Sequence, residues 1–327
     1  MEGEIQMMAE EIILKRYPGN PIITPKDFPG AKAVFNPGQT MYNGKTILLL
    51  SVIHNKAYEY QGRIHKSTTH VAESDDGINF TINREEPFIY MTDQEPYKTA
   101  GEQAIDLRIT KIDDTYYIVH PGSGPWGTFG ILGKTRDFKK HEYIDIISLP
   151  DNRLPCLFPE KIKGLYARID RPYRVAPNDF HNFGHLWISY SPDLIFWGKH
   201  RPLLKPGYSH WNRTKIGPVP PIKTREGWLV LIHGVVPSCT GHRYSIGAIL
   251  LDLENPEIIR GKTQCSILEP YEPYELMGIV PNVVFVCGAI ADEARDEIRV
   301  YYGCADTCIG LATGKLSELV DACIKGI

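Results

Sequence analysis

Short apolar runs recur along the chain, separated by polar, glycine-rich turns. Five of them resemble one another, and they begin at residues 44, 114, 184, 227 and 297, with spacings of 70, 70, 43 and 70 residues. Their sequences are GKTILLLS, DTYYIVHP, GHLWISYS, GWLVLIHG and EIRVYYG. Runs of this length that are rich in β-branched and aromatic residues, and bounded by Gly, Asn or Asp, predict β-strands.

Each run has a strand candidate on either side, so the unit that repeats has three or four strands. The preceding candidates include AVFNPGQTMY and AIDLRITKI, and the following ones include GILGKTRDFKKH and IGLATGKLSEL. Five self-similar units of this kind predict an all-β fold, a five-bladed β-propeller. A β-sandwich with insertions is the competing interpretation, but it does not account for five copies of one unit.

The two ends of the chain have a different pattern. In the N-terminal MEGEIQMMAEEIILKRY, Ile5, Met8 and Ile12 fall on one face of a helix, so residues 1–18 are predicted to form a short helical extension. This segment lacks the positively charged start and apolar block of a signal peptide. Residues 19–327 are predicted to form a single propeller domain, with a further helical pattern only at its end, in LSELVDACIKGI.

Polar side chains interrupt the strand that opens each unit. The stretch LYARIDRP, for example, places two arginines and an aspartate within four positions. Because unpaired charge is expensive to bury, such residues need partners and access to solvent. The first strand of each propeller blade lines the central axis, so polar groups from five blades are expected to meet in one axial pocket. These groups are Asn36, Asp106 with Arg108, Arg168 with Asp170 and Arg171, Lys215, and Asn282.

Composition limits the partners. The 327 residues carry a formal net charge of −3, which gives no broad basic field for nucleic acid. The longest apolar run, residues 47–53, is too short to span a bilayer, so no membrane partner is expected. Seven cysteines without a CxxC pair predict reduced thiols in a cytoplasmic protein. No second pair accompanies Cys304 and Cys308 at the spacing of a metal site, so no metal is expected.

Several cations are expected to share the axial pocket. They are Arg168, Arg171 and Lys215 from the opening strands, Arg153 from DNRLPCLFPEK, and His233 from LVLIHGV. Guanidinium and ammonium groups are the usual protein ligands of phosphate and carboxylate. Each cation taken singly could instead form a structural ion pair with a carboxylate such as Asp170 or Glu160. Their convergence from three repeats favours an anion site.

Asp106 is the candidate proton donor. Hydrolysis of a glycoside needs two carboxylates, one to protonate the leaving oxygen and one to act as nucleophile or base. No second one is obvious, because other opening strands carry Asn36, Lys215 and Asn282, and the flanking arginines should hold Asp170 ionised as an ion-pair partner. One acid beside an anion site fits a reaction in which inorganic phosphate is itself the nucleophile.

Five segments carry a resemblance to a known family. They are VFNPGQTMYNGK, LFPEKIKGLYARIDRP, KIGPVPPIKTREGWLVLIHGV, ILEPYEPYELMGIVPNVVFVCG and YYGCADTCIGLAT, and together they resemble the hallmark segments of glycoside hydrolase family 130 from about Asn20 to Gly314. The resemblance implies a five-bladed propeller. It also implies, as for most members, an inverting phosphorylase that converts β-1,4-linked mannosides and phosphate into α-mannose 1-phosphate. Some members instead hydrolyse β-1,2-mannosides.

The resemblance implies a role for each polar group. Asp106 matches the catalytic aspartate, which in the family protonates a mannose hydroxyl that relays the proton to the glycosidic oxygen. Ile105 and Leu107 replace the Glu and Pro of the commoner EDPR form. The phosphate-binding set is Arg153, Arg171, Lys215, His233 and Tyr244, with Arg168 adjacent. Asn36 and Asp306 match sugar-contacting positions, and the substrate-binding set also includes Arg108, Asp170 and Asn282.

The expected function is therefore inverting phosphorolysis of β-1,4-linked mannosides, either mannosyl-glucose or mannooligosaccharides. Inorganic phosphate is the co-substrate, no cofactor is implied, and a homo-oligomer is expected from the relatives. One alternative is a hydrolase of the same fold with Asp170, Glu269 or Glu275 as base, which the cations argue against. The other is a non-catalytic propeller that binds sugar or a protein partner, which Asp106 argues against.

Overall fold

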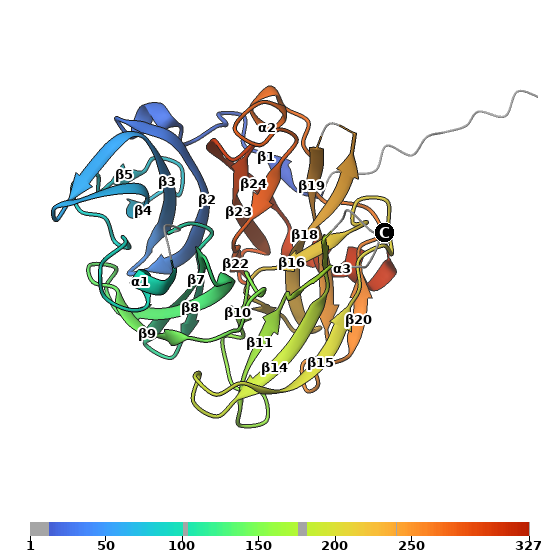
Figure 1. Cartoon of the computed structure of the whole chain (residues 1–327). Coiled ribbons are helices and arrows are strands. Elements are labelled where there is room, and N and C mark those ends of the chain that lie inside the picture. Colours follow the sequence, from blue (N-terminus) through green and yellow to red (C-terminus); the bar gives the residue numbers. More distant parts are fainter. Residues whose placement is uncertain (1–12, 101–103, 176–181, 240, 327) are drawn as a thin grey trace, which may run out of the picture.

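The computed structural model describes residues 13–100, 104–175, 182–239 and 241–326 of the chain. Their strands form five separate sheets that are almost entirely antiparallel. The sheets stand around a central axis, as the blades of a propeller do (Figure 1). The five-bladed β-propeller that the repeats predict is confirmed.

The first two blades have four strands each. Blade 1 contains β2 (Ala31–Tyr42), β3 (Lys45–Tyr60), β4 (Arg63–Ser74) and β5 (Thr81–Ile82). Blade 2 contains β6 (Arg108–Ile112), β7 (Thr115–Gly124), β8 (Gly127–Thr135) and β9 (Glu142–Ile146).

The remaining blades are less regular. Blade 3 contains β10 (Cys156–Leu157), β11 (Tyr166–Asp170), β14 (Leu186–Ser191) and β15 (Gly198–Leu204). Blade 4 contains β16 (Lys215–Pro218), β18 (Trp228–Ser238), β19 (Gly241–Leu251) and β20 (Ile259–Lys262), with β17 (Ile222–Lys223) beside β18 and the hairpin β12 (Tyr173–Val175) and β13 (Asn182–Gly184) beside β16. Blade 5 contains β21 (Val284–Val286), β23 (Glu297–Cys304), β24 (Cys308–Gly314) and β1 (Lys15–Arg16), with β22 (Ile290–Asp292) beside β23.

Blade 3 begins one strand earlier than the sequence predicts. The stretch LYARIDRP forms β11, which is the second strand, and the first strand is the two-residue β10. A strand of two residues has no periodicity that a sequence pattern could reveal. Arg153 lies just before β10, as Asp106 lies just before β6. The axial position of blade 3 therefore belongs to Arg153, and not to Arg168 or Asp170.

Neighbouring blades pack face to face through apolar side chains. Successive side chains of a strand point to opposite faces. In β3, Leu48 and Leu50 accordingly pack with blade 5, whereas Ile47 and Leu49 pack with blade 2. Each of the five interfaces between adjacent blades holds its own cluster of buried residues. Strands buried on both faces have continuous apolar runs, which explains the pattern ILLL at 47–50.

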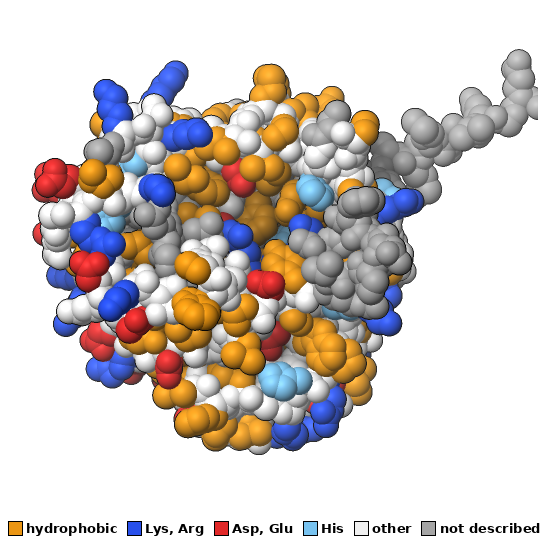
Figure 2. All heavy atoms as spheres, viewed as in Figure 1, with side chains coloured by type: hydrophobic (Ala, Val, Ile, Leu, Met, Phe, Trp, Pro, Cys, Tyr) orange, Lys and Arg blue, Asp and Glu red, His pale blue; other side chains and the backbone are white. Residues whose placement is uncertain are grey.

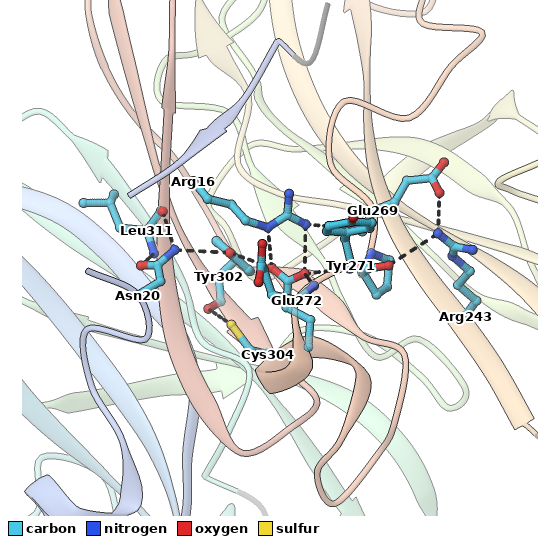
Figure 3. Close-up of polar contacts among 11 residues, drawn as sticks. Arg16, Asn20, Arg243, Glu269, Tyr271, Glu272, Tyr302, Cys304 and Leu311 are labelled. Atoms are coloured by element: carbon cyan, nitrogen blue, oxygen red, sulfur yellow. Dashed lines mark hydrogen bonds and ion pairs between the residues drawn. The ribbon is translucent and has the colours of Figure 1, made fainter. Parts of the chain in front are cut away.

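The ring closes between the two ends of the described chain. Strand β1 pairs with β24, so blade 5 contains strands from both ends. Arg16 donates from Nε and Nη2 to the carboxylate of Glu275, at 2.8 Å each, and from Nη2 to the backbone carbonyl of Glu269 at 2.5 Å. Figure 3 shows Arg16 at the centre of this group of contacts. Lys15–Arg16 is thus extended and not part of the predicted N-terminal helix, whose residues 1–12 lie outside the described part of the chain.

The helices lie outside the blades. Helix α3 (Leu316–Lys325), predicted from LSELVDACIKGI, buries Leu319 and Val320 in the cluster between blades 4 and 5 and ends at Gly326 in a left-handed conformation. Helices α1 (Tyr97–Ala100) and α2 (Pro273–Leu276) and the 3-10 helix Pro25–Asp27 are about one turn each. Within the described ranges, no helix has the length and apolarity that crossing a membrane requires.

Candidate active site

A cavity of about 180 Å³ opens where the blades meet. Figure 2 shows a hollow near the middle of this face of the molecule. All five blades contribute to its wall, as expected for a pocket on the propeller axis. The lining residues are Asn36, Asp106, Arg153, Leu154, Arg171, Tyr173, His233, Tyr244, Val280, Val283, Phe285 and Asp306.

Asp106 lies two residues before β6 with a φ of 57°, a left-handed conformation that Asp adopts more readily than most residues. Its backbone N–H donates to Ser51 Oγ at 3.0 Å. Its Oδ1 accepts from Asn36 Nδ2 and its Oδ2 from Arg153 Nη2, both at 2.8 Å. Burial favours a raised pKa, but the charges of Arg153 and Arg108 and these hydrogen bonds outweigh it and lower the pKa of Asp106. The carboxylate is therefore ionised when the cavity holds no ligand.

A second carboxylate, that of Asp306, lines the same cavity. Asp306 belongs to the turn between β23 and β24 and lines the cavity together with Asn36 and Asp106. Burial and the negative charge of Asp106 raise the pKa of Asp306 to about 7. The family resemblance predicts Asp306 only as a sugar contact, and the sequence offers Asp170, not Asp306, as the best candidate for a second carboxylate. The cavity thus holds one ionised carboxylate and one that titrates near neutral pH.

Three predicted phosphate ligands lie near Tyr173, namely Arg171, Arg153 and Lys215. Arg171 Nη2 donates to Tyr173 Oη at 2.9 Å, and Lys215 Nζ lies 5.8 Å from the centre of the ring. Burial favours a raised pKa for Tyr173, but Arg171, Arg153 and Lys215 together lower it. Burial, assisted by both arginines and opposed by Tyr173, lowers the pKa of Lys215. These shifts record a concentration of positive charge, which an anion would relieve.

His233 lies deep in the cavity. The centre of its ring is 4.6 Å from that of Phe285 and 5.9 Å from that of Tyr244. Burial, reinforced by the surrounding cations, lowers its pKa well below the ordinary value, so the imidazole is neutral. Among the described residues its Nδ1 has no hydrogen-bond partner. Gly217 lies opposite on β16, where an added Cβ would stand 2.1 Å from His233 Cε1, so only glycine leaves room for this ring.

Arg108 lies behind the cavity wall. It is 1% exposed and donates from Nη1 to the backbone carbonyl of Asp106, and its guanidinium lies 5.5 Å from the centre of the Phe285 ring. Within the described chain, its Nε and Nη2 have no hydrogen-bond partner. Arg108 therefore acts on the site through its charge on Asp106.

Arg168 and Asp170 form a buried ion pair outside the cavity wall. Arg168 Nε lies 2.8 Å from Asp170 Oδ1, and the Arg168 guanidinium stacks on Trp197 at 4.1 Å from the ring centre. Asp170 also accepts from Asn152 Nδ2 at 2.8 Å and from Ser189 Oγ at 2.5 Å. In LYARIDRP, the first arginine and the aspartate thus neutralise each other, whereas the second arginine enters the cavity.

Asn282 also lies outside the wall. Its φ is 62°, and its backbone carbonyl accepts from the Tyr244 N–H at 3.0 Å. Its contact with the site therefore runs through the backbone of Tyr244, which does line the cavity.

Sequence reasoning missed the less polar part of the wall. Tyr173 lies two residues after Arg171, the one signal that could have pointed to it. Phe285 belongs to the apolar run VVFV, which cannot be distinguished from core. The remaining unpredicted wall residues are Leu154, Val280 and Val283.

Neither glutamate considered as a hydrolytic base lies in the cavity. Glu275 is fully buried and bonded to Arg16 and to Tyr302 Oη. Glu269 is paired with Arg243 and bonded to Ser266. In the part of the chain that the structure describes, no group of three or more His, Cys, Asp or Glu side chains is placed to hold a metal ion.

The fold and site define a class: a five-bladed β-propeller whose axial cavity holds an aspartate against a cluster of cations. Residues 13–325 match the family model for glycoside hydrolase family 130, described as beta-1,4-mannooligosaccharide phosphorylase. The chain belongs to this family.

Curated relatives cover almost the whole chain. A beta-1,2-mannobiose phosphorylase of Listeria innocua is 36% identical over 93% of this chain and 97% of its own length. A beta-1,4-mannooligosaccharide phosphorylase of Ruminococcus albus is 32% identical over 94% of this chain and 90% of its own length. The solved structure of beta-1,2-mannobiose phosphorylase from Listeria innocua with beta-1,2-mannobiose matches with a TM-score of 0.82 and 32% identity over 95% of this chain and 99% of that one.

Proposed function

We propose that this protein is an inverting β-mannoside phosphorylase. The observation that carries the proposal is the common cavity of Asp106, Arg153, Arg171 and His233, with Lys215 beside it. Family membership and the phosphorylase activity named for the relatives support the same reaction class.

In this reaction the cations hold phosphate below the anomeric carbon of a mannosyl residue. One phosphate oxygen forms a bond to the anomeric carbon, while the bond between that carbon and the glycosidic oxygen breaks. The departing sugar oxygen takes a proton from Asp106, relayed through a mannose hydroxyl. Arg153, Arg171 and Lys215 partly neutralise the phosphate, and neutral His233 offers a further donor. Attack from the opposite face gives α-mannose 1-phosphate.

The linkage is the finer part of the proposal. The sequence resemblance predicts β-1,4, and one named relative at 32% identity acts on β-1,4-mannooligosaccharides. Relatives at 36% and 35% identity are named for β-1,2-mannobiose and 1,2-β-oligomannan. The β-1,4 hypothesis is thus not confirmed, and we propose a β-1,2-linked substrate as the preferred one.

Phosphate dependence is the decisive test. Purified protein is incubated with β-1,2-mannobiose, β-1,4-mannobiose or β-1,4-mannosyl-glucose, with and without phosphate. We expect mannose 1-phosphate only where phosphate is present, and faster release from the β-1,2-linked substrate. Equal cleavage without phosphate would assign the protein to the hydrolases. Faster cleavage of a β-1,4-linked substrate would favour the β-1,4 specificity that the sequence resemblance predicts.

Removal of the acid is the second test. Asp106→Asn keeps the shape and the bond to Arg153 but cannot supply a proton, so kcat should fall by at least about 100-fold. Circular dichroism should be unchanged. Activity close to that of the wild type would remove Asp106 from this role.

One observation favours a hydrolase as the second candidate. Asp306 is a second carboxylate in the cavity, and with a pKa of about 7 it could accept a proton from water. The same phosphate-free incubation decides between the two reactions.

A further inference from the structure

Arg153 is shared between the acid and the anion site. Its Nη2 lies 2.8 Å from Asp106 Oδ2. The Arg153 side chain is 27% exposed, whereas that of Asp106 is 4% exposed. One edge of the guanidinium is therefore committed to the buried acid while another part of it reaches the cavity.

This pairing conflicts with the role of a proton donor. Asp106 faces Arg153 and Arg108, and both favour its ionised form. An ionised carboxylate has no proton to give. The other titratable or charged groups around the cavity are Arg171, Tyr173, Lys215, His233, Tyr244 and Asp306. Among these described groups, Asp306 is the only other carboxylate, and its negative charge favours protonation of Asp106.

We propose that a bound oxyanion draws the Arg153 guanidinium away from Asp106, and that the released carboxylate takes up a proton from solvent. Asp106 then carries a proton only when the phosphate nucleophile is bound. This inference rests on the proposed function, because it requires that the cation cluster bind phosphate.

Electrostatics gives the direction of the effect. A guanidinium that is bonded to a doubly charged oxyanion stabilises the ionised form of a neighbouring carboxylate less strongly. The oxyanion also places negative charge near Asp106, which favours the neutral carboxyl. Because linkage is reciprocal, protonation of Asp106 must strengthen anion binding by the same factor. Water carries no charge to draw Arg153 away, so Asp106 would stay ionised without phosphate. The enzyme would therefore hydrolyse a bound mannoside slowly when phosphate is absent.

Sulfate is a suitable probe because it resembles phosphate but has no proton that titrates near neutral pH. Isothermal titration calorimetry of sulfate binding, repeated in buffers of different ionisation enthalpy, counts the protons taken up. Asp306 also titrates in this range, so Asp306→Asn is the reference protein. We expect it to take up a fraction of a proton, at most one, per sulfate bound at neutral pH.

The double variant Asp106→Asn/Asp306→Asn separates Asp106 from the other groups. We expect its proton uptake to be lower by the amount that Asp106 contributes, and its sulfate affinity to depend less on pH. In Asp306→Asn the affinity should rise as pH falls, by at most about tenfold per pH unit for one coupled proton. Circular dichroism checks that both variants are folded.

The outcomes distinguish a failure of the proton coupling from a failure of the proposed function. Sulfate binding with equal proton uptake in both variants would overturn the coupling but leave the anion site intact. Failure of the folded wild type to bind either sulfate or phosphate would overturn the proposed function, and the coupling with it.

Discussion

The two carboxylates of the cavity differ in proton affinity because of a single kind of neighbour. Both line the cavity together with Asn36. Asp106 is paired directly with a guanidinium, which lowers its pKa in spite of its burial. For Asp306, burial and the charge of Asp106 prevail, and its pKa rises to about 7. Charge pairing therefore outweighs burial at one position and not at the other.

This difference predicts how stability depends on pH. The pKa of Asp306 is raised in the folded protein from its ordinary 3.8 to about 7, so its stabilising contribution is complete below the unfolded value and is lost as pH rises through the folded one. We expect the free energy of unfolding of the wild type, relative to Asp306→Asn, to fall by about 2 kcal/mol from about pH 4 to pH 8, a part of the full shift because the cavity is open to solvent. Urea unfolding at several pH values measures this difference, and a constant difference would contradict the prediction.

At the scale of the element, the strands that run through the core were the most predictable. Apolar runs such as the one at 47–50 are continuous because both faces of each blade are buried, and this repeats in every blade. Strand β10 has only two residues and gives no such pattern. The sequence therefore predicts β11 as the first strand of blade 3, although it is the second. The axial polar positions of blades 1 and 2 could still be predicted, because each stands at a fixed place relative to a long strand.

Alternation along β11 explains which predicted cations lie in the cavity. Arg168 and Asp170 are two positions apart and share a face, where they pair with each other. Arg171 follows the last residue of β11 and lines the cavity. The charges alone could not separate these roles, but their parity relative to the apolar Ala167 and Ile169 could have. The aromatic wall could not be predicted from pattern, because a residue such as Phe285 has the same sequence signal whether it faces a ligand or the core.

Asn152 connects the buried ion pair to the cation site. Its Nδ2 donates to Asp170 at 2.8 Å, and its Oδ1 accepts from the backbone N–H of Arg171 at 3.1 Å. Its chain neighbour is Arg153. Asn152→Ala should lower the free energy of unfolding by about 1–3 kcal/mol, because Asp170 loses a buried donor. It should also raise KM for phosphate by about tenfold, since two cations lose their positioning, with a smaller effect on KM for the mannoside.

A matched variant controls for loss of stability alone. Asn20 likewise connects two segments. Its Nδ2 donates to the Leu311 carbonyl at 2.9 Å and its Oδ1 accepts from the Leu311 N–H at 2.8 Å (Figure 3), and neither residue lines the cavity. Asn20→Ala should lower stability without changing KM for phosphate. Equal effects of the two variants on that KM would show that Asn152 has no positioning role.

At the scale of the whole molecule, the site depends on closure of the ring. The cavity takes residues from all five blades, so any opening between blades would separate them. Blades 1 to 4 are each built from nearby parts of the chain, whereas blade 5 needs β1 from the other end. The pairing of β1 with β24 is only two residues long, which leaves Arg16 and Glu275 as the main polar connection between β1 and the segment that carries Val280 and Val283.

Loss of this connection should therefore weaken the entire propeller. Arg16→Met leaves the fully buried Glu275 without its cation, so we expect the free energy of unfolding to fall by about 3–5 kcal/mol. Burial opposes ionisation of Glu275, but Arg16 and the backbone N–H groups of Tyr271 and Glu272 lower its pKa. A lowered pKa gives stability that is present above the unfolded value and is lost as pH falls, so the gap between wild type and variant should narrow in acid. The double variant Arg16→Met/Glu275→Gln, which buries no charge, should recover more than half of the loss at neutral pH. Urea unfolding measures all three proteins, and a double variant no more stable than Arg16→Met would show that the strand pairing, and not the ion pair, holds the ring closed.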